Sequence, residues 1–206
     1  DSVESLVRHE FLYSESIKAL DLATAINNGH PGLMTPEPEL IQNILKSYAT
    51  EKESESGSVW TLNDHESFAT RNEDIKTLRD IIEKMARRLD LKRQLGTDVI
   101  YYLDDHDEEL FTFFVSGSAI ISETIQRNKG LSGKKLIVLP GSRANLISYK
   151  LRRDPSLQAL LGDDWHFVKF RLIRNLNDNP LLTRDLFASQ IFGDPPEYQS
   201  SQLALF

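Results

Sequence analysis

Apolar and polar residues follow two different periods in the middle of the chain, and these periods predict a mixed α/β domain. Short continuous apolar runs favour buried strands, whereas apolar residues repeated every three to four positions favour a helix that packs on one side. The acidic segment 104–109 separates two such runs and predicts a solvent-exposed turn. In chain order the pattern predicts strands at 99–103 and 110–115, a helix at 119–128, a strand at 136–139 and a helix at 142–151.

The flanking segments are mostly helical in pattern. Helices are predicted at 3–26, 39–48, 73–95 and 180–190, and strands at 59–62 and 165–173. The segment 50–58 is polar and lacks apolar periodicity, so we interpret it as a mobile loop. These patterns divide the chain into an N-terminal helical extension (1–50), an α/β core (51–192) and a flexible C-terminal tail (193–206).

Composition narrows the class of protein. The chain has 206 residues, 40% of them hydrophobic and 27% charged, which suits one α/β domain with a small appendage. It contains no cysteine, so disulfides and thiolate metal sites are excluded. Because no apolar run reaches the length of a membrane span and no signal-peptide pattern opens the chain, we expect a cytoplasmic protein without a membrane partner.

Charge is distributed unevenly. The net charge is −7, whereas proteins that hold duplex DNA over their whole surface are usually basic. Basic residues nevertheless gather in the segments 84–93, 127–135 and 143–153, and the acidic excess lies mainly in residues 1–80. A local basic face is therefore compatible with the sequence, although charged residues also solvate ordinary helix surfaces.

Several short motifs follow one another along the chain: Val59-Trp60-Thr61-Leu62-Asn63-Asp64, Thr97-Asp98-Val99, Phe113-Phe114-Val115-Ser116 and the helix that carries Arg127. In this order they resemble the restriction-endonuclease-like, or PD-(D/E)XK, superfamily, and in particular a bacterial group within it. The resemblance covers roughly residues 37–176 and predicts a restriction-endonuclease-like core with a mixed central sheet.

The resemblance implies a Mg²⁺ site, and the residues at that site depart from the family pattern. Asp98 matches the first metal ligand, but Phe114 stands where a Glu is expected and Ser116 where the next catalytic residue is expected. Phenylalanine cannot bind a hard cation, which requires oxygen ligands. Glu123 on the following helix is a candidate relocated acid, with Asp64 and Glu39 as further candidates. The alternative interpretation is that Glu123 is a solvated helix residue and that Asp64 forms an Asx turn.

Binding residues follow from the same comparison and from the tail. Arg127, Lys129, Arg143 and Lys150 are the candidates for DNA contact. The final residues Gln202, Leu203, Leu205 and Phe206 lie in a Gln-Leu-Ala-Leu-Phe segment that resembles the short bacterial peptide that binds the sliding clamp. Such a tail would present apolar anchors to a groove, although it could instead pack on its own domain.

Three functions remain open from the sequence. The first is a nuclease-fold module in bacterial DNA processing or defence that has lost catalysis and binds DNA or protein. The second is an active Mg²⁺-dependent endonuclease with relocated acids, which would need Mg²⁺ as its cofactor. The third is a protein–protein adaptor that docks a larger partner.

Overall fold

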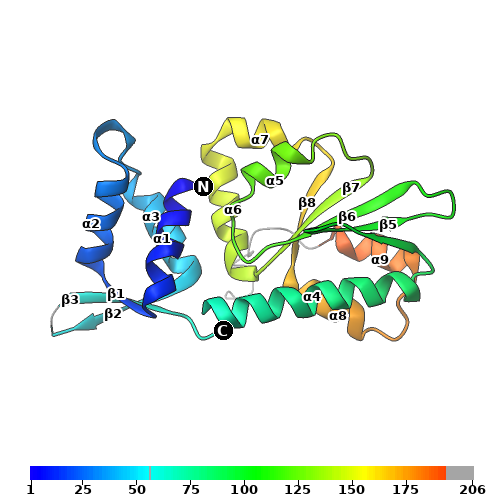
Figure 1. Cartoon of the computed structure of the whole chain (residues 1–206), viewed down its shortest axis with the longest axis horizontal. Helices are drawn as coiled ribbons and strands as arrows, with labels where there is room; N and C mark the ends of the chain where they lie inside the picture. The colour runs from blue at the N-terminus through cyan, green and yellow to red at the C-terminus, as the bar shows by residue number, and fades with distance from the viewer. Residues whose placement is uncertain (56, 194–206) are drawn as a thin grey trace, which may run out of the picture.

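Two β-sheets organise the chain, one in the N-terminal part and one in the α/β core. The computed structural model describes residues 1–55 and 57–193. In Figure 1 the N-terminal unit lies at the left and the core at the right, with α6 (Gly141–Arg153) between them. The fold class is α/β, as the sequence predicts. Within the described residues, no helix has both the length and the apolar character needed to cross a membrane.

The N-terminal unit combines helices with a small antiparallel sheet of order β1-β3-β2. Its elements are α1 (Ser2–Tyr13), β1 (Ser16–Lys18), α2 (Ala19–Gly29), the 3₁₀ turn η1 (Gly32–Met34), α3 (Pro38–Tyr48), β2 (Ala49–Ser54) and β3 (Gly57–Leu62). The unit therefore extends to Leu62, past the boundary at residue 50 that the polar composition indicates.

Two predictions for this unit are wrong, and strand pairing explains both. The continuous helix predicted at 3–26 is interrupted by β1, because Ile17 pairs with Trp60 of β3. The loop predicted at 50–58 instead contributes most of β2 and the start of β3, with Lys52 opposite Val59. Its side chains are exposed beyond Ala49, so no apolar alternation marks the strand.

The core contains a five-stranded mixed sheet of order β4-β5-β6-β7-β8. Strands β4 to β6 are antiparallel neighbours, whereas β6, β7 and β8 run parallel. The core elements are α4 (Phe68–Arg88), β4 (Lys92–Leu95), β5 (Val99–Leu103), β6 (Glu109–Val115), α5 (Ser122–Arg127), β7 (Lys134–Leu139), α6, α7 (Pro155–Leu161), β8 (Trp165–Lys169), α8 (Phe170–Asp178) and α9 (Arg184–Ile191).

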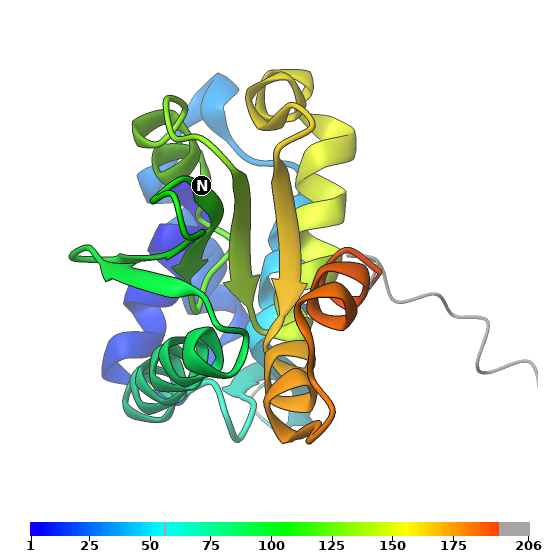
Figure 2. The ribbon, with the colours of Figure 1, turned by 90° about the vertical axis from the view of Figure 1, so that its right-hand side faces the viewer.

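Each face of this sheet carries its own hydrophobic core. Phe113 points to the face that α4, α8 and α9 cover, and Phe114 points to the face covered by α5, α6 and α7. Figures 1 and 2 show these two helix layers on opposite sides of the sheet. The second core continues into the N-terminal unit through residues such as Val7 and Tyr48. Strand β7, which lies between β6 and β8, is buried on both faces, which explains its unbroken apolar run.

Two predicted elements are shorter than expected, and the rest of each predicted range forms the other type of secondary structure. The helix predicted at 73–95 ends at Arg88, and Asp90 adopts a left-handed backbone with φ of 52°. The chain then reverses, and β4 pairs with β5. The strand predicted at 165–173 ends at Lys169, where its partner strand β7 also ends at Leu139, and α8 begins. In both places, a tertiary contact sets the boundary.

Candidate functional site

The three positions that the resemblance assigns to catalysis lie where β5 and β6 begin and end. Asp98 is exposed and directly precedes β5, whose first residue Val99 pairs with Phe114. Phe114 is 7% exposed and its ring stacks on Trp165, with ring centroids 5.4 Å apart. Ser116 forms a local turn, in which its hydroxyl accepts a 3.1 Å hydrogen bond from the amide of Ser118. The position expected for a metal-binding acid is thus occupied by an aromatic ring that stacks on a second one.

The candidate relocated acids lie on separate elements. Glu123 on α5 is exposed and forms an ion pair with Arg127. Glu39 on α3 forms a 3.3 Å ion pair with Arg153, and Asp64 is exposed in the turn before α4. Among residues 1–55 and 57–193, no group of three His, Asp or Glu side chains is placed to hold a metal ion. The structure does not bring Asp98 and these acids together.

The acidic segment between β5 and β6 is a solvent-exposed turn, as predicted. One carboxylate oxygen of Asp104 accepts hydrogen bonds from the amides of His106 at 2.8 Å and Glu108 at 2.9 Å. These bonds, led by the one from Glu108, lower the pKa of Asp104. Lys92 of β4 also pairs with Asp107 at 2.8 Å. The segment is thus a self-contained turn closed by its own first residue.

The four basic candidates divide into two exposed and two buried side chains. Arg127 has 73% of its side chain exposed, and Lys129 is also exposed. Arg143 is completely buried and Lys150 is 7% exposed. Both buried cations are held by carboxylates, so neither can reach a phosphate on the surface of this structure.

Lys150 joins the N-terminal unit to the core through a buried cluster. Its ammonium group donates to Glu4 at 2.6 Å, to Asp1 at 2.9 Å and to the carbonyl oxygen of Ala119 at 2.7 Å. Glu4 also accepts from the hydroxyl of Tyr48 at 2.5 Å and from the amide of Ala119 at 2.7 Å. All three ammonium protons and both carboxylate oxygens are therefore satisfied.

The charges of this cluster depend on one another. Burial alone would raise the pKa of Glu4, but the charge of Lys150 and the hydrogen bonds from Lys150, Tyr48 and Ala119 outweigh it and lower that pKa. Burial raises the pKa of Tyr48, so its hydroxyl stays a proton donor to Glu4. A buried charge is tolerable only when it is paired and hydrogen-bonded in this way.

A second buried cluster, centred on Arg143, lies beside the first. The guanidinium of Arg143 donates to the carbonyl oxygens of Gly117 and Ser47, forms an ion pair with Glu66, and lies 3.3 Å from the centroid of the Tyr48 ring. Glu66 is shared with Arg71, at 2.7 Å. The ion pairs continue from Arg71 to Asp74 at 2.9 Å and from Asp74 to Arg174 at 2.8 Å.

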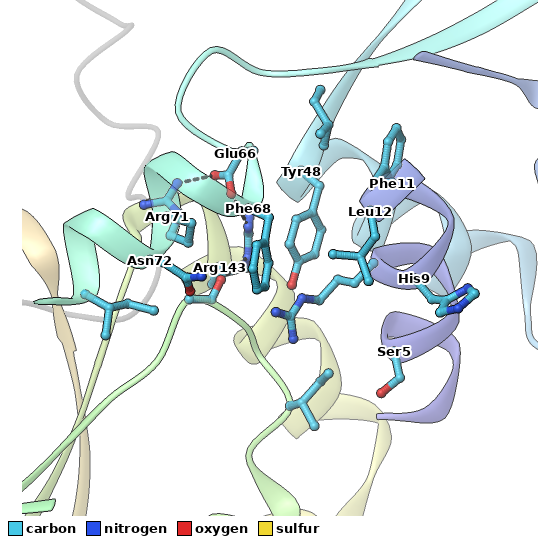
Figure 3. Close-up of a pocket in the computed structure, with 15 residues that line it drawn as sticks. Ser5, His9, Phe11, Leu12, Tyr48, Glu66, Phe68, Arg71, Asn72 and Arg143 are labelled. Atoms are coloured by element: carbon cyan, nitrogen blue, oxygen red, sulfur yellow. Dashed lines mark hydrogen bonds and ion pairs between the residues drawn. The ribbon is translucent and has the colours of Figure 1, made fainter. Parts of the chain in front are cut away.

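A cavity of about 340 Å³ opens next to these clusters, between α1 and the start of α4. Figure 3 shows Leu12 and His9 of α1 on one side of it and Phe68 and Asn72 of α4 on the other. The ring of Tyr48 lies between the two sides. This cavity combines charged and apolar side chains on its walls.

The two acids that neutralise the buried cations, Glu4 and Glu66, are not among the site residues predicted from the sequence. Glu4 carried a usable signal, because it lies next to Val3 on the α1 face that also presents Val7 and Phe11 to the core. A charged residue on an apolar helix face must find a buried partner. Glu66 offered no such signal, since it lies in a turn and its partner Arg143 is 77 positions away.

Comparison with known proteins adds no assignment. Neither a scan against protein-family models nor a search of curated proteins finds a match for this chain.

Proposed function

We propose that this chain is a nuclease-type α/β module of DNA processing or defence that works by binding and does not hydrolyse DNA. The order of its core elements supports this proposal. Helix α4 is followed by the antiparallel strands β4, β5 and β6, then by α5 and the parallel strand β7. This is the order that the resemblance to the restriction-endonuclease-like superfamily leads one to expect.

The stacked pair Phe114–Trp165 carries the non-catalytic part of the proposal. Metal-dependent hydrolysis needs two or more oxygen ligands that hold the cation and the attacking water. At this end of β5 and β6, Asp98 faces solvent and its expected partner position is an aromatic core residue. A single carboxylate leaves too few ligands for this chemistry.

The exposed end of α5 is the surface that we propose for DNA. Lys129 makes no hydrogen bond or ion pair with any residue that the structure describes. Among residues 1–55 and 57–193, the ion-pair partner of Arg127 is Glu123, one helical turn away, and both side chains are largely exposed. Such a pair contributes little to stability, so Arg127 can exchange it for a phosphate. Arg143 and Lys150 are not part of this surface, because they are buried.

Binding of a labelled DNA duplex, measured by fluorescence anisotropy at several salt concentrations, tests the surface. The double variant Arg127→Ala/Lys129→Ala should bind more weakly and lower the salt slope by about 2, because each lost phosphate contact lowers it by about 1. The matched control Lys18→Ala/Lys52→Ala removes two exposed cations from the N-terminal sheet and should leave binding unchanged. Equal loss in both variants would show only a general charge effect.

A protein-binding role is the second candidate, and the charge of the N-terminal unit favours it. Residues 1–62 hold ten acidic and four basic side chains, a net charge of −6. The connectivity of α1, β1, α2, α3 and the β2–β3 hairpin also occurs in winged helix DNA-binding units, but a fold does not fix a function. The hairpin here carries Glu51 and Glu53 on exposed positions, which would repel phosphates. This unit therefore suits a basic protein partner better than DNA.

A further inference from the structure

One of the arginines that line the cavity between α1 and α4 has no carboxylate partner among the described residues. Arg143 and Arg71 on its wall are neutralised by Glu66 and by Asp74. The side chain of Arg8, which also lines the cavity, makes no hydrogen bond or ion pair with any of the described residues. Its charge therefore lacks a carboxylate partner in the part of the chain that the structure covers.

The apolar side chains of the cavity lie at its mouth as well as on its walls. Phe68 is 60% exposed and Leu12 is 50% exposed, and both line the cavity. Figure 3 shows them on opposite sides, with the Phe68 ring beside the ring of Tyr48. One face of Tyr48 is already covered by Arg143, whereas Phe68 offers an exposed aromatic surface on which a planar group can stack.

Polar groups at the rim add hydrogen-bonding capacity. The amide of Asn72 lines the cavity and is exposed, so it offers both a donor and an acceptor. Deeper in the wall, the buried Nε of Arg71 has no acceptor among the described residues. The volume of about 340 Å³ falls within the range of roughly 300–1,000 Å³ that small-ligand pockets occupy.

We propose that this cavity binds an organic phosphate that carries a planar base, that is, a mononucleotide unit. The phosphate pairs with Arg8, whose guanidinium matches a phosphate with two parallel hydrogen bonds. The base stacks on Phe68 and reaches Asn72. The unit can be a free nucleoside monophosphate or the 5′-phosphorylated end of a DNA strand, because both present the same phosphate beside the same base. The proposal does not depend on DNA contact by α5.

Isothermal titration of the full chain with adenosine 5′-monophosphate, adenosine and inorganic phosphate tests the site. We expect the monophosphate to bind about tenfold or more tightly than adenosine, as a charge-assisted hydrogen bond implies. Arg8→Gln should remove that advantage, and Phe68→Ala should weaken the monophosphate and adenosine alike. Lys18→Gln, an exposed cation on β1 outside the cavity, is the matched control and should change neither affinity.

Unfolding temperatures of the variants without ligand establish that each one is folded. A short single strand with a 5′-phosphate, compared with the same strand ending in a 5′-hydroxyl, separates the two sources of the mononucleotide. Arg127→Ala/Lys129→Ala should keep its affinity for the monophosphate, so failure of the α5 surface and failure of this site are distinguishable. Equal affinity for adenosine and its monophosphate, no binding of any probe, or full binding by folded Arg8→Gln would each overturn the proposal.

Discussion

The rings of Phe114 on β6 and Trp165 on β8 stack with their planes inclined by 30° and their centroids 5.4 Å apart. Both side chains belong to the hydrophobic core that continues into the N-terminal unit. The position at which the family resemblance predicts a metal-binding acid thus belongs to the hydrophobic core shared by the N-terminal unit and the α/β core. Replacing it by an acid would bury a charge and remove that packing at once.

The first prediction concerns the contribution of this aromatic pair to stability. Phe114→Ala should lower the free energy of unfolding by about 3–5 kcal/mol, because it removes a buried ring and leaves a cavity. Urea unfolding followed by circular dichroism measures the change. Phe68→Ala is the matched control, since that ring is 60% exposed and its loss should cost far less. Similar losses for the two variants would mean that Phe114 is not a packing residue.

The second prediction concerns the coupling of Lys150 to Glu4. Lys150→Met should destabilise the chain by about 3–5 kcal/mol, because it leaves the fully buried Glu4 without its cation. The double variant Glu4→Gln/Lys150→Met should lose much less than the sum of the two single variants. Urea unfolding of all four proteins gives the coupling energy. Additive losses would show that the 2.6 Å contact contributes nothing of its own.

The third prediction follows from the lowered pKa of Glu4. A carboxyl whose pKa is lower in the folded state than in the unfolded state stabilises the fold when it is ionised. For Glu4 this stabilisation is complete when the pH is above the pKa of the unfolded state, 4.5, and it is lost as the pH falls through the lower pKa of the folded state. Unfolding free energies of the wild type and of Glu4→Gln, measured from pH 7 down to acid, should therefore converge below pH 4.5. A gap that stays constant, or widens, on acidification would contradict the assignment.

The fourth prediction concerns the tail, which lies outside the described residues. If Gln202-Leu203-Ala204-Leu205-Phe206 binds a bacterial sliding clamp, Leu203→Ala/Phe206→Ala should abolish binding to immobilised clamp in surface plasmon resonance, because a few apolar anchors dominate such interfaces. Ala204→Ser, a change between the anchors, serves as the control. Clamp binding that survives loss of both anchors would remove the tail from the proposed function.

The central core elements were predictable from the sequence, because their signals are local. β5, β6, α5, β7 and α6 follow from apolar runs and helical periods, although α5 begins at Ser122 and is shorter than expected. Long-range pairing was not predictable. The local pattern of β4 predicts a helix, and only its pairing with β5 makes it a strand. β2 shows no apolar face that would predict a strand.

The candidate site was harder to predict than the fold. The sequence pattern places Arg143 and Lys150 in a basic helix and predicts that both are surface cations. In the structure both are buried, and each is paired with a carboxylate that lies at least 77 positions away in the sequence. A sequence gives the charge of a residue but not its distant partner. The substitution of Phe114 at the acid position was visible in the sequence, and the structure adds the partner Trp165 that explains why an aromatic residue fits there.

The most direct test of the central claim is an assay for hydrolysis under conditions in which binding is also measured. End-labelled DNA that anisotropy shows to be bound is incubated with Mg²⁺ or Mn²⁺ and increasing wild-type protein, beside Asp98→Ala. We predict binding without cleavage, and no difference between the two proteins. Metal-dependent cleavage by the wild type that Asp98→Ala lacks would contradict the account and identify an active nuclease.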